Sequence, residues 1–376
     1  LVLAISTVLI IITILTNFYG TTDIYDYSDT AKFFAGKYDA KIRTSHSYLY
    51  GFLHAGAVGL FESFFIFKIT SLISLLLIVY SVYWMTKDKR ALWLMLLSPI
   101  VWYMAPWISP IQFSSLLFLW GFYFIRKYDA GKDIKKNILY LFYSGLLMGL
   151  AWAFWDAVLF FAPLLIISFF YNKKLMHVIY YLIFILVGVL PRLILDQILF
   201  GFAFFTVGRQ IFSSLALTFL GGFYAQGGLW GHGSFILLII FFPIFTYLLF
   251  KKKIFLENRK SAIFIMLSVL LLIINSQIRF VLLIIPIIII QSSKDLKKSH
   301  YITQTVISLI LILLVLNPYI LQIGWGTGIG GEKGAEFDSF VKNIDKIDLT
   351  DRFEREVIRE DIYEIAEEFS NEIFVV

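Results

Sequence analysis

Through Leu321, apolar residues form long runs that are separated by short polar or basic interruptions. A helix needs about 20 mainly apolar residues to cross the hydrocarbon core of a bilayer. The runs predict about eleven membrane-spanning helices. They lie at 1–17, 64–86, 91–106, 111–125, 137–153, 156–171, 177–198, 233–250, 261–275, 279–291 and 302–320. The pattern therefore predicts an all-α polytopic membrane protein with roughly eleven to thirteen transmembrane helices.

Two further apolar stretches, 47–63 and 202–220, are interrupted by glycine, histidine, serine or charged residues. A single crossing by either stretch would reverse the side of every later loop. We interpret both as interfacial or re-entrant helices on the outer face. The alternative is that the two stretches add one extra pair of spans, which would leave the later topology unchanged.

Basic residues in alternate connections predict the orientation. Of the 26 Lys and Arg residues before Gln322, 18 fall in the connections 87–90, 126–136, 173–174, 251–260 and 294–298. Cytoplasmic loops of membrane proteins are enriched in Lys and Arg, so these connections are predicted to be cytoplasmic. The first outer loop, 18–63, and the large outer loop, 199–232, then lie on the extracytoplasmic face of a cell membrane.

Composition agrees with this class. The chain is 59% hydrophobic and only 15% charged, with a mean hydropathy of +0.82, whereas soluble domains carry about 25% charged residues. A secreted, disordered or nucleic-acid-binding protein is thereby excluded as the main interpretation. The chain has no cysteine, which excludes disulfides and thiolate chemistry.

The segment 322–376 has a different character. Residues 332–372 contain 14 Asp and Glu against six Lys and Arg, after the glycine-rich link 324–331. Apolar residues from Phe353 to Phe369 recur at helical spacing, which predicts an amphipathic helix. We interpret the segment as an extracytoplasmic tail that begins a small, truncated soluble domain.

Polar side chains that the basic loops do not explain gather on the predicted outer face, where such groups indicate function. They are Asp23, Asp26, Asp29, Asp39, Arg43, His46, Trp155, Asp156, Arg192, Asp196, Arg209, His232 and Arg279. Three aspartates lie within seven residues after the first span, a pattern that suits a general base for a hydroxyl or a divalent cation site. The alternative is a solvated loop in which Asp29 caps a short helix at 30–35.

The first outer loop also resembles that of the GT-C superfamily of integral-membrane glycosyltransferases, which use polyprenyl-phosphate sugars. The resemblance includes Asp23, the pair Tyr38–Asp39 and the segment from Arg43-Thr44 to Tyr48. Further similar landmarks are 97–99, 145–165, 196–205 and 279–286, so that most of residues 1–291 is covered. The superfamily includes protein and GPI mannosyltransferases and lipid A aminoarabinose transferases, and these motifs do not distinguish the subfamily.

The resemblance implies that residues 1–321 form a transmembrane catalytic domain. Such a domain would transfer a sugar, for example the hexose mannose, from a polyprenyl-phosphate donor to a hydroxyl of a glycan, lipid or protein acceptor, with inversion. It makes Asp23 the first choice and Asp26 the second choice for the general base. The resemblance implies no cofactor beyond the lipid-linked donor substrate. It does not decide whether Asp23 and Asp26 bind a divalent cation.

The remaining outer residues receive supporting roles. Arg192, Arg209 and Arg279, with His232, are candidates for binding the leaving phosphate, because guanidinium binds phosphate in bidentate geometry. A local Arg192–Asp196 pair and interfacial snorkelling of Arg279 are the alternatives. Asp29, Arg43, His46, Trp155 and Asp156 are supporting or acceptor-binding candidates. Asp156 substitutes for a second acidic residue that many members carry and that 105–112 lacks here.

Two other functions compete with this one. An envelope polysaccharide polymerase, ligase or lipid-linked oligosaccharide flippase shares the long spans and outer arginines, but does not need aspartates directly after the first span. A secondary transporter would carry ionisable residues at mid-membrane depth and repeated halves, and neither is evident in the sequence.

Overall fold

The computed structural model describes residues 2–15, 23–36, 48–61, 65–130, 134–170, 173, 175–216, 244, 259–274 and 278–316. Within these ranges the protein is helical and contains no strand. The predicted all-α class is therefore confirmed for the described part of the chain. The predicted span at 233–250, apart from residue 244, and the tail at 322–376 lie outside the described residues.

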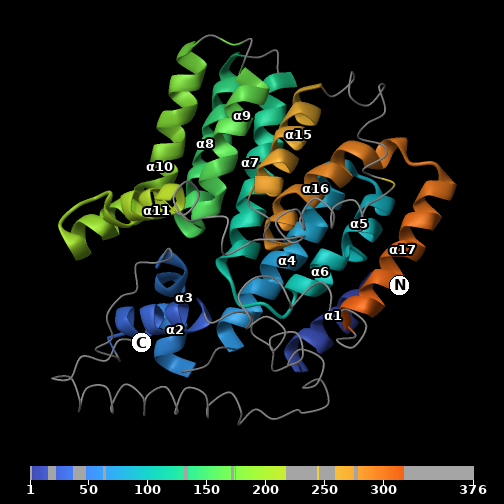
Figure 1. The fold of residues 1–376 in the computed structure, drawn as a ribbon, viewed down its shortest axis with the longest axis horizontal. Coiled ribbons are helices and arrows are strands. Elements are labelled where there is room, and N and C mark those ends of the chain that lie inside the picture. Colours follow the sequence, from blue (N-terminus) through green and yellow to red (C-terminus); the bar gives the residue numbers. More distant parts are fainter. Residues whose placement is uncertain are drawn as a thin grey trace.

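Two groups of helices flank a central helix (Figure 1). The first group is α7 (Pro110–Ala130), α8 (Ile134–Phe154), α9 (Phe161–Phe170), α10 (Leu175–Phe200) and α15 (Arg259–Ile274). The second is α1 (Val2–Leu15), α4 (Phe65–Thr86), α5 (Lys89–Leu96), α6 (Pro99–Met104) and α17 (Lys298–Leu316). Between them lies α16 (Val281–Ser292), in which every residue is buried. An apolar helix buried on all sides belongs to the core of the bundle.

Three helices of the described chain are long and apolar enough to cross a membrane, namely Phe65–Thr86, Lys135–Phe154 and Leu175–Phe200. Their apolar surfaces identify an integral membrane protein. Shorter apolar helices occur at Val2–Ile14, Leu49–Val58 and Asp156–Phe170. The total of about eleven spans stays a prediction.

Two predicted spans differ in detail from the structure. The stretch 91–106, expected as one span, is split into α5 and α6. Ser98 is extended there (φ −66, ψ 125), because a residue that precedes a proline is disfavoured in the helical conformation. The stretch 156–171 begins with the 3-10 helix η1 (Asp156–Phe160) before α9 starts.

The predicted first outer loop contains two packed helices, α2 (Asp23–Phe34) and α3 (Leu49–Phe61). The rings of Tyr27 and Tyr50 meet edge to face with centroids 5.3 Å apart. A Cβ added at Gly51 would lie 2.7 Å from Cβ of Thr30, so glycine permits this close approach. The alternative of a short helix at 30–35 is therefore wrong about where the helix begins. Because α2 begins at Asp23, Asp29 lies inside the helix and is not its cap.

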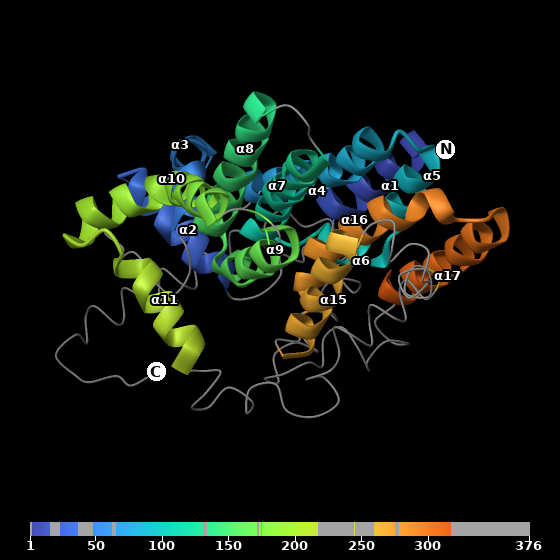
Figure 2. The ribbon, with the colours of Figure 1, turned by 90° about the horizontal axis from the view of Figure 1, so that it is seen from above.

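The stretch 202–220 contains α11 (Phe205–Ala216). It runs outward from the lower end of α10 and projects away from the bundle in the view from above (Figure 2). Helices of 13 and 12 residues, such as α3 and α11, are about 20 Å long and too short for a hydrocarbon core of about 30 Å. Both lengths fit the interfacial interpretation.

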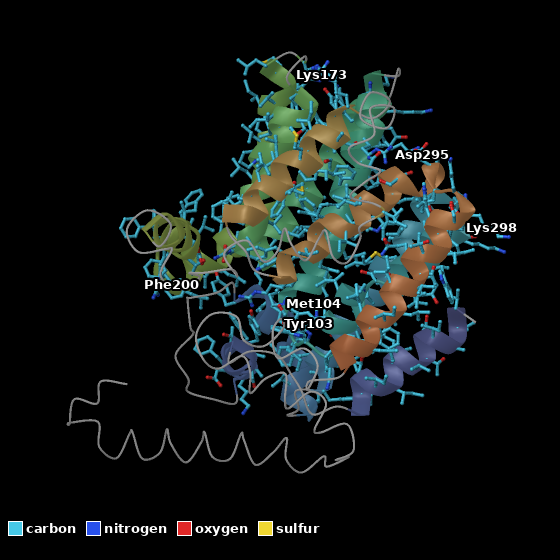
Figure 3. All side chains as sticks on the ribbon, turned by 45° about the vertical axis from the view of Figure 1, so that its right-hand side comes forward. Tyr103, Met104, Lys173, Phe200, Asp295 and Lys298 are labelled. Carbon is cyan, nitrogen blue, oxygen red and sulfur yellow. The ribbon has the colours of Figure 1, made fainter. Side chains whose placement is uncertain are left out.

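Lys173 and Asp295, from the basic connections 173–174 and 294–298, lie toward one end of the bundle (Figure 3). Tyr103 and Met104 lie toward the other end (Figure 3). The Arg90 side chain donates to the carbonyl of Leu296 over 3.4 Å, which joins the connections 87–90 and 294–298. The helices α2, α3 and α11 gather at the opposite end (Figure 1). This separation is what the charge pattern requires, and the assignment of the two ends to membrane faces stays a prediction.

Candidate functional site

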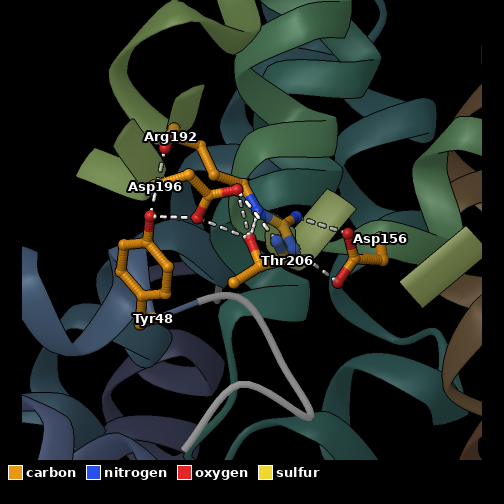
Figure 4. Close-up of polar contacts among 5 residues, drawn as sticks. All are labelled: Tyr48, Asp156, Arg192, Asp196 and Thr206. Carbon is orange, nitrogen blue, oxygen red and sulfur yellow. Dashed lines mark hydrogen bonds and ion pairs between the residues drawn. The ribbon is translucent and has the colours of Figure 1, made fainter. Parts of the chain in front are cut away.

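A buried polar cluster joins five residues from four separate segments (Figure 4). Tyr48 directly precedes α3, Asp156 begins η1, Arg192 and Asp196 lie in α10, and Thr206 lies in the first turn of α11. All five are buried. We call these residues the polar junction.

The sequence of α10 and the turn after it build one half of the junction. Arg192 and Asp196 lie one turn apart on the same helix face, and both side chains are fully buried. At the end of α10, Gly201 adopts a left-handed conformation (φ 71), which glycine tolerates. The chain then turns back, and the rings of Phe200 and Phe205 stack with centroids 4.6 Å apart. Thr206 is thereby placed against Asp196.

The Arg192 guanidinium lies between Asp156 and Thr206. Its Nη1 donates to Oδ1 of Asp156, its Nη2 lies 3.5 Å from Oδ2 of the same carboxylate, and its Nε donates to Oγ1 of Thr206 over 3.0 Å. Asp196 is linked to this guanidinium through Thr206. The alternative of a local Arg192–Asp196 ion pair is therefore wrong, because the ion pair of Arg192 is with Asp156.

The Asp196 carboxylate accepts hydrogen bonds from two segments. The backbone N–H of Thr206 donates over 3.0 Å and the Thr206 hydroxyl donates over 2.8 Å, so Asp196 caps the start of α11. The Tyr48 hydroxyl donates to Oδ1 over 2.6 Å and lies 3.0 Å from the carbonyl of Arg192. Burial, and then the hydrogen bond to Asp196, raise the pKa of Tyr48, so the phenol stays protonated and acts as the donor.

The junction places three charged side chains together in the buried part of the bundle. One guanidinium and two carboxylates are buried together, and removal of charge from water costs several kcal/mol per ion. Hydrogen bonds to every charged group offset this cost, and ionisable groups in such surroundings mark functional positions. The arrangement fixes α3, η1, α10 and α11 relative to one another.

The predicted general bases lie on α2. Asp23 and Asp26 belong to its first turn, and Asp29 belongs to its second turn and is buried. The side chains of Asp23 and Asp26 lie outside the described part of the chain, as do Arg43, His46 and His232. No three His, Cys, Asp or Glu residues converge as metal ligands among the side chains that the structure describes.

Other predicted residues lie at the same end of the bundle. The ring of Trp155, which precedes Asp156, contacts the ring of Phe280, which follows Arg279, with centroids 5.1 Å apart. Arg279 is partly exposed, and Arg209 is exposed on α11. The structure thus brings Asp156 and Arg192 into direct contact, and it links the segments of Trp155 and Arg279.

Sequence reasoning gives no functional role to three members of the junction. Tyr48 ends the Arg43–Tyr48 segment of the GT-C resemblance, Asp196 is one of the outer polar residues and a possible local partner of Arg192, and Thr206 directly follows the landmark 196–205. The available signal for Thr206 was its place after the apolar stretch 198–205, which contains the turn at Gly201. A hydroxyl placed between an arginine and an aspartate could be recognised only from the structure.

No known family model and no curated protein matches the chain. Two solved structures match it, namely ArnT from Cupriavidus metallidurans in the apo state and the same protein bound to undecaprenyl phosphate. Each has a TM-score of 0.60 and 13% sequence identity, over 84% of this chain and 63% of the ArnT chain. The chain therefore spans less than two thirds of the length of ArnT. The likeness shows that the chain shares the fold of ArnT, which is a GT-C glycosyltransferase, an aminoarabinose transferase.

Proposed function

We propose that this protein is a membrane glycosyltransferase that uses a polyprenyl-phosphate-linked sugar donor. The observation that carries the proposal is the ArnT-like fold over 84% of the chain, since one of the matching ArnT structures is bound to undecaprenyl phosphate. The acceptor hydroxyl belongs to a glycan, lipid or protein on the extracytoplasmic face. The transferred sugar is a hexose such as mannose.

The arrangement of polar residues supports this proposal. The helix that carries Asp23 and Asp26 packs on α3, and α3 is bonded through Tyr48 to the junction that contains Arg192. Acidic and basic groups are therefore gathered around the polar junction and the helix pair that is bonded to it. Group transfer from a lipid phosphate needs both kinds of group, a base for the acceptor and positive charge for the leaving phosphate.

The chemistry follows from these two requirements. The carboxylate of Asp23, or of Asp26 as the second choice, takes the proton of the acceptor hydroxyl. The acceptor oxygen then forms a bond to the anomeric carbon, while the bond from that carbon to the phosphate oxygen breaks. The polyprenyl phosphate leaves with the bonding electron pair, and attack from the opposite face inverts the anomeric configuration.

Arginine side chains stabilise the phosphate as its negative charge develops. Arg209 and Arg279 have exposed surface through which they can contact a phosphate. Arg192 is enclosed by Asp156 and Thr206 and would contact phosphate only after leaving Asp156. His232 is an auxiliary donor in this scheme.

A transfer assay tests the proposed base. Membranes that contain the protein are supplied with radiolabelled polyprenyl-phosphate sugar, and the unchanged chain is compared with Asp23→Asn, Asp26→Asn and the double variant. Loss of a general base lowers the rate by about 10²–10⁴-fold. Asp88→Asn is the matched control, since Asp88 caps α5 in the connection 87–90 and asparagine caps a helix equally well.

The outcomes separate the competing functions. Full activity in the double Asp23/Asp26 variant at normal expression would disprove the proposed base. If no donor yields a labelled product, but labelled lipid or solute crosses the membrane unchanged, a flippase or a transporter would replace this proposal. Extension of a lipid-linked chain by whole repeat units would favour the polymerase or ligase.

A further inference from the structure

Two tyrosine hydroxyls hold the start of α3 from different directions. The Tyr48 hydroxyl donates to Asp196 of α10 over 2.6 Å. The Tyr50 hydroxyl lies 2.8 Å from Oγ of Ser71 in α4, and 3.3 Å from the carbonyl of Phe67. Residues two positions apart point to different sides of a helix. The first turn of α3 is therefore fixed between two of the helices that are long enough to span a membrane.

The helix α2 rests on this fixed turn. Phe34 at the end of α2 contacts the ring of Tyr48, with centroids 6.2 Å apart, and the ring of Phe52, with centroids 4.9 Å apart. Beside Phe52, Gly51 approaches Thr30 so closely that a side chain at position 51 would not fit between the helices. A displacement of α3 is therefore transmitted to α2 and to the aspartates in its first turn.

We propose that Tyr48 is a positioning residue, whose hydroxyl holds the α2–α3 pair against α10 by its bond to Asp196. The effect of this positioning role on catalysis rests on the proposed function, because α2 carries the proposed bases. The docking of the α2–α3 pair against α10 does not depend on the proposed function. The chemical group responsible is the hydroxyl and not the ring.

The surroundings of Tyr48 allow the hydroxyl to be tested by itself. The ring contacts Phe34 and Phe200, with centroids 6.2 and 6.4 Å away, and phenylalanine keeps both contacts. Asp196 retains its two bonds from Thr206 when the phenol is lost. A hydrogen bond to a carboxylate is roughly twice as strong as one between neutral groups. Tyr48→Phe therefore removes one strong link and leaves the packing in place.

The first measurement follows the docking of α2 without reference to activity. The chain has no cysteine, so Ala35→Cys, directly after α2, introduces a single thiol at a partly buried position. The rate of maleimide labelling is compared with and without Tyr48→Phe. We expect labelling to be at least about threefold faster in the Tyr48→Phe background, because a lost bond to a charged group favours local opening. Equal rates would overturn the proposal.

The matched control is Tyr181→Phe. Tyr181 is also fully buried, but it lies in the part of α10 that packs on Phe170, with ring centroids 5.2 Å apart. Removal of its hydroxyl leaves labelling at Ala35→Cys unchanged if the effect of Tyr48 is specific. An equal increase in both variants would mean general loosening of the bundle and would also overturn the proposal.

The second measurement is the transfer assay. We expect Tyr48→Phe to lower kcat about tenfold with less than about twofold change in KM for the donor, since misplacement of a base affects the chemical step. The double variant Tyr48→Phe with Asp196→Asn is expected to be no slower than the slower single variant, because Asp196→Asn weakens the same link that Tyr48→Phe removes. Additive losses would show that Tyr48 does not act through Asp196.

The labelling and transfer measurements test different parts of the proposal. Faster labelling with no transfer by any variant, the unchanged chain included, would keep the positioning role and reject the proposed function. Faster labelling with unchanged kcat would reject the catalytic role of the link. If Tyr48→Phe does not accumulate in membranes, Asp196→Asn serves in both measurements, with the same direction of change expected from a weaker acceptor.

Discussion

The helix α10 contacts its neighbours by two different kinds of interaction along its length. Its earlier part packs on α8 through glycines, which we call the glycine interface (Gly145, Gly149 and Gly188). A Cβ on Gly149 would lie 2.8 Å from Cα of Gly188, so the two backbones touch directly. Its later part carries Arg192 and Asp196 and contacts its neighbours through the ion pair and hydrogen bonds of the polar junction.

The difference shows what each kind of contact contributes. Small residues allow close van der Waals packing in a membrane and need no polar group to be removed from water. The glycine interface therefore supplies stability by close packing, at positions where even a Cβ would meet the backbone of the neighbouring helix. The polar junction costs desolvation energy, but it is directional, since hydrogen bonds require their donors and acceptors to be aligned. We infer that the junction sets the relative positions of α3, η1, α10 and α11.

The largest expected effect comes from breaking the ion pair of the polar junction. Arg192→Met leaves the Asp156 carboxylate buried without its cation, and loss of one partner of a buried pair costs about 3–5 kcal/mol. Denaturant unfolding of the purified protein in detergent measures the cost. Arg90→Met is the matched control. Arg90 pairs with Asp88 over 3.2 Å with 47% of its side chain exposed, and surface pairs contribute about 0–1 kcal/mol.

A second substitution tests whether that cost arises from the uncompensated charge. Asp156→Asn in the Arg192→Met background removes the buried carboxylate charge, so part of the lost stability should return. A further loss of stability in the double variant would contradict this explanation. The cost of Arg192→Met would then have to be explained by lost packing and not by the buried charge of Asp156.

The next largest effect concerns the glycine interface. Gly149→Leu forces α8 and α10 apart, because a side chain at this position would meet the backbone of Ile185 and Gly188. Overpacking of this kind typically costs about 1–3 kcal/mol. The same unfolding measurement applies, with Gly56→Leu in α3 as the control, since a Cβ there meets nothing within 4 Å. If both variants are equally stable, the two helices do not pack as closely as described.

Much of the helical framework could be predicted from apolar runs. The runs 64–86, 137–153 and 177–198 correspond to the helices Phe65–Thr86, Ile134–Phe154 and Leu175–Phe200, because helices that cross a bilayer need long apolar segments. The stretch 91–106 was mispredicted for a local reason, which is the effect of Pro99 on Ser98. The helix α2 was underpredicted because its mixed polar composition carries no strong helical period.

The site was predictable as a set of residues but not as a set of contacts. Asp156 and Arg192 were both recognised as unusual outer polar residues, yet they are 36 positions apart, and their pairing depends on how η1 docks on α10. Tyr48 and Asp196 are 148 positions apart. Partner choice at such separations is determined by tertiary packing, which periodicity and charge patterns do not encode.

The smallest expected effect is the difference between removing one hydroxyl beside the glycine interface and removing one hydroxyl in the polar junction. Ser144, beside the glycine interface, donates to the carbonyl of Gly121 over 2.8 Å, and such bonds in membrane proteins average about 0.6 kcal/mol. Thr206→Val removes a hydroxyl that bridges Arg192 and Asp196. Loss of one hydrogen-bond partner from buried charged groups costs about 1–3 kcal/mol or more. Ser144→Ala should therefore lower the free energy of unfolding by at least about 0.4 kcal/mol less than Thr206→Val. Equal losses in the unfolding experiment would mean that the polar junction is no more directional than an ordinary interhelical contact.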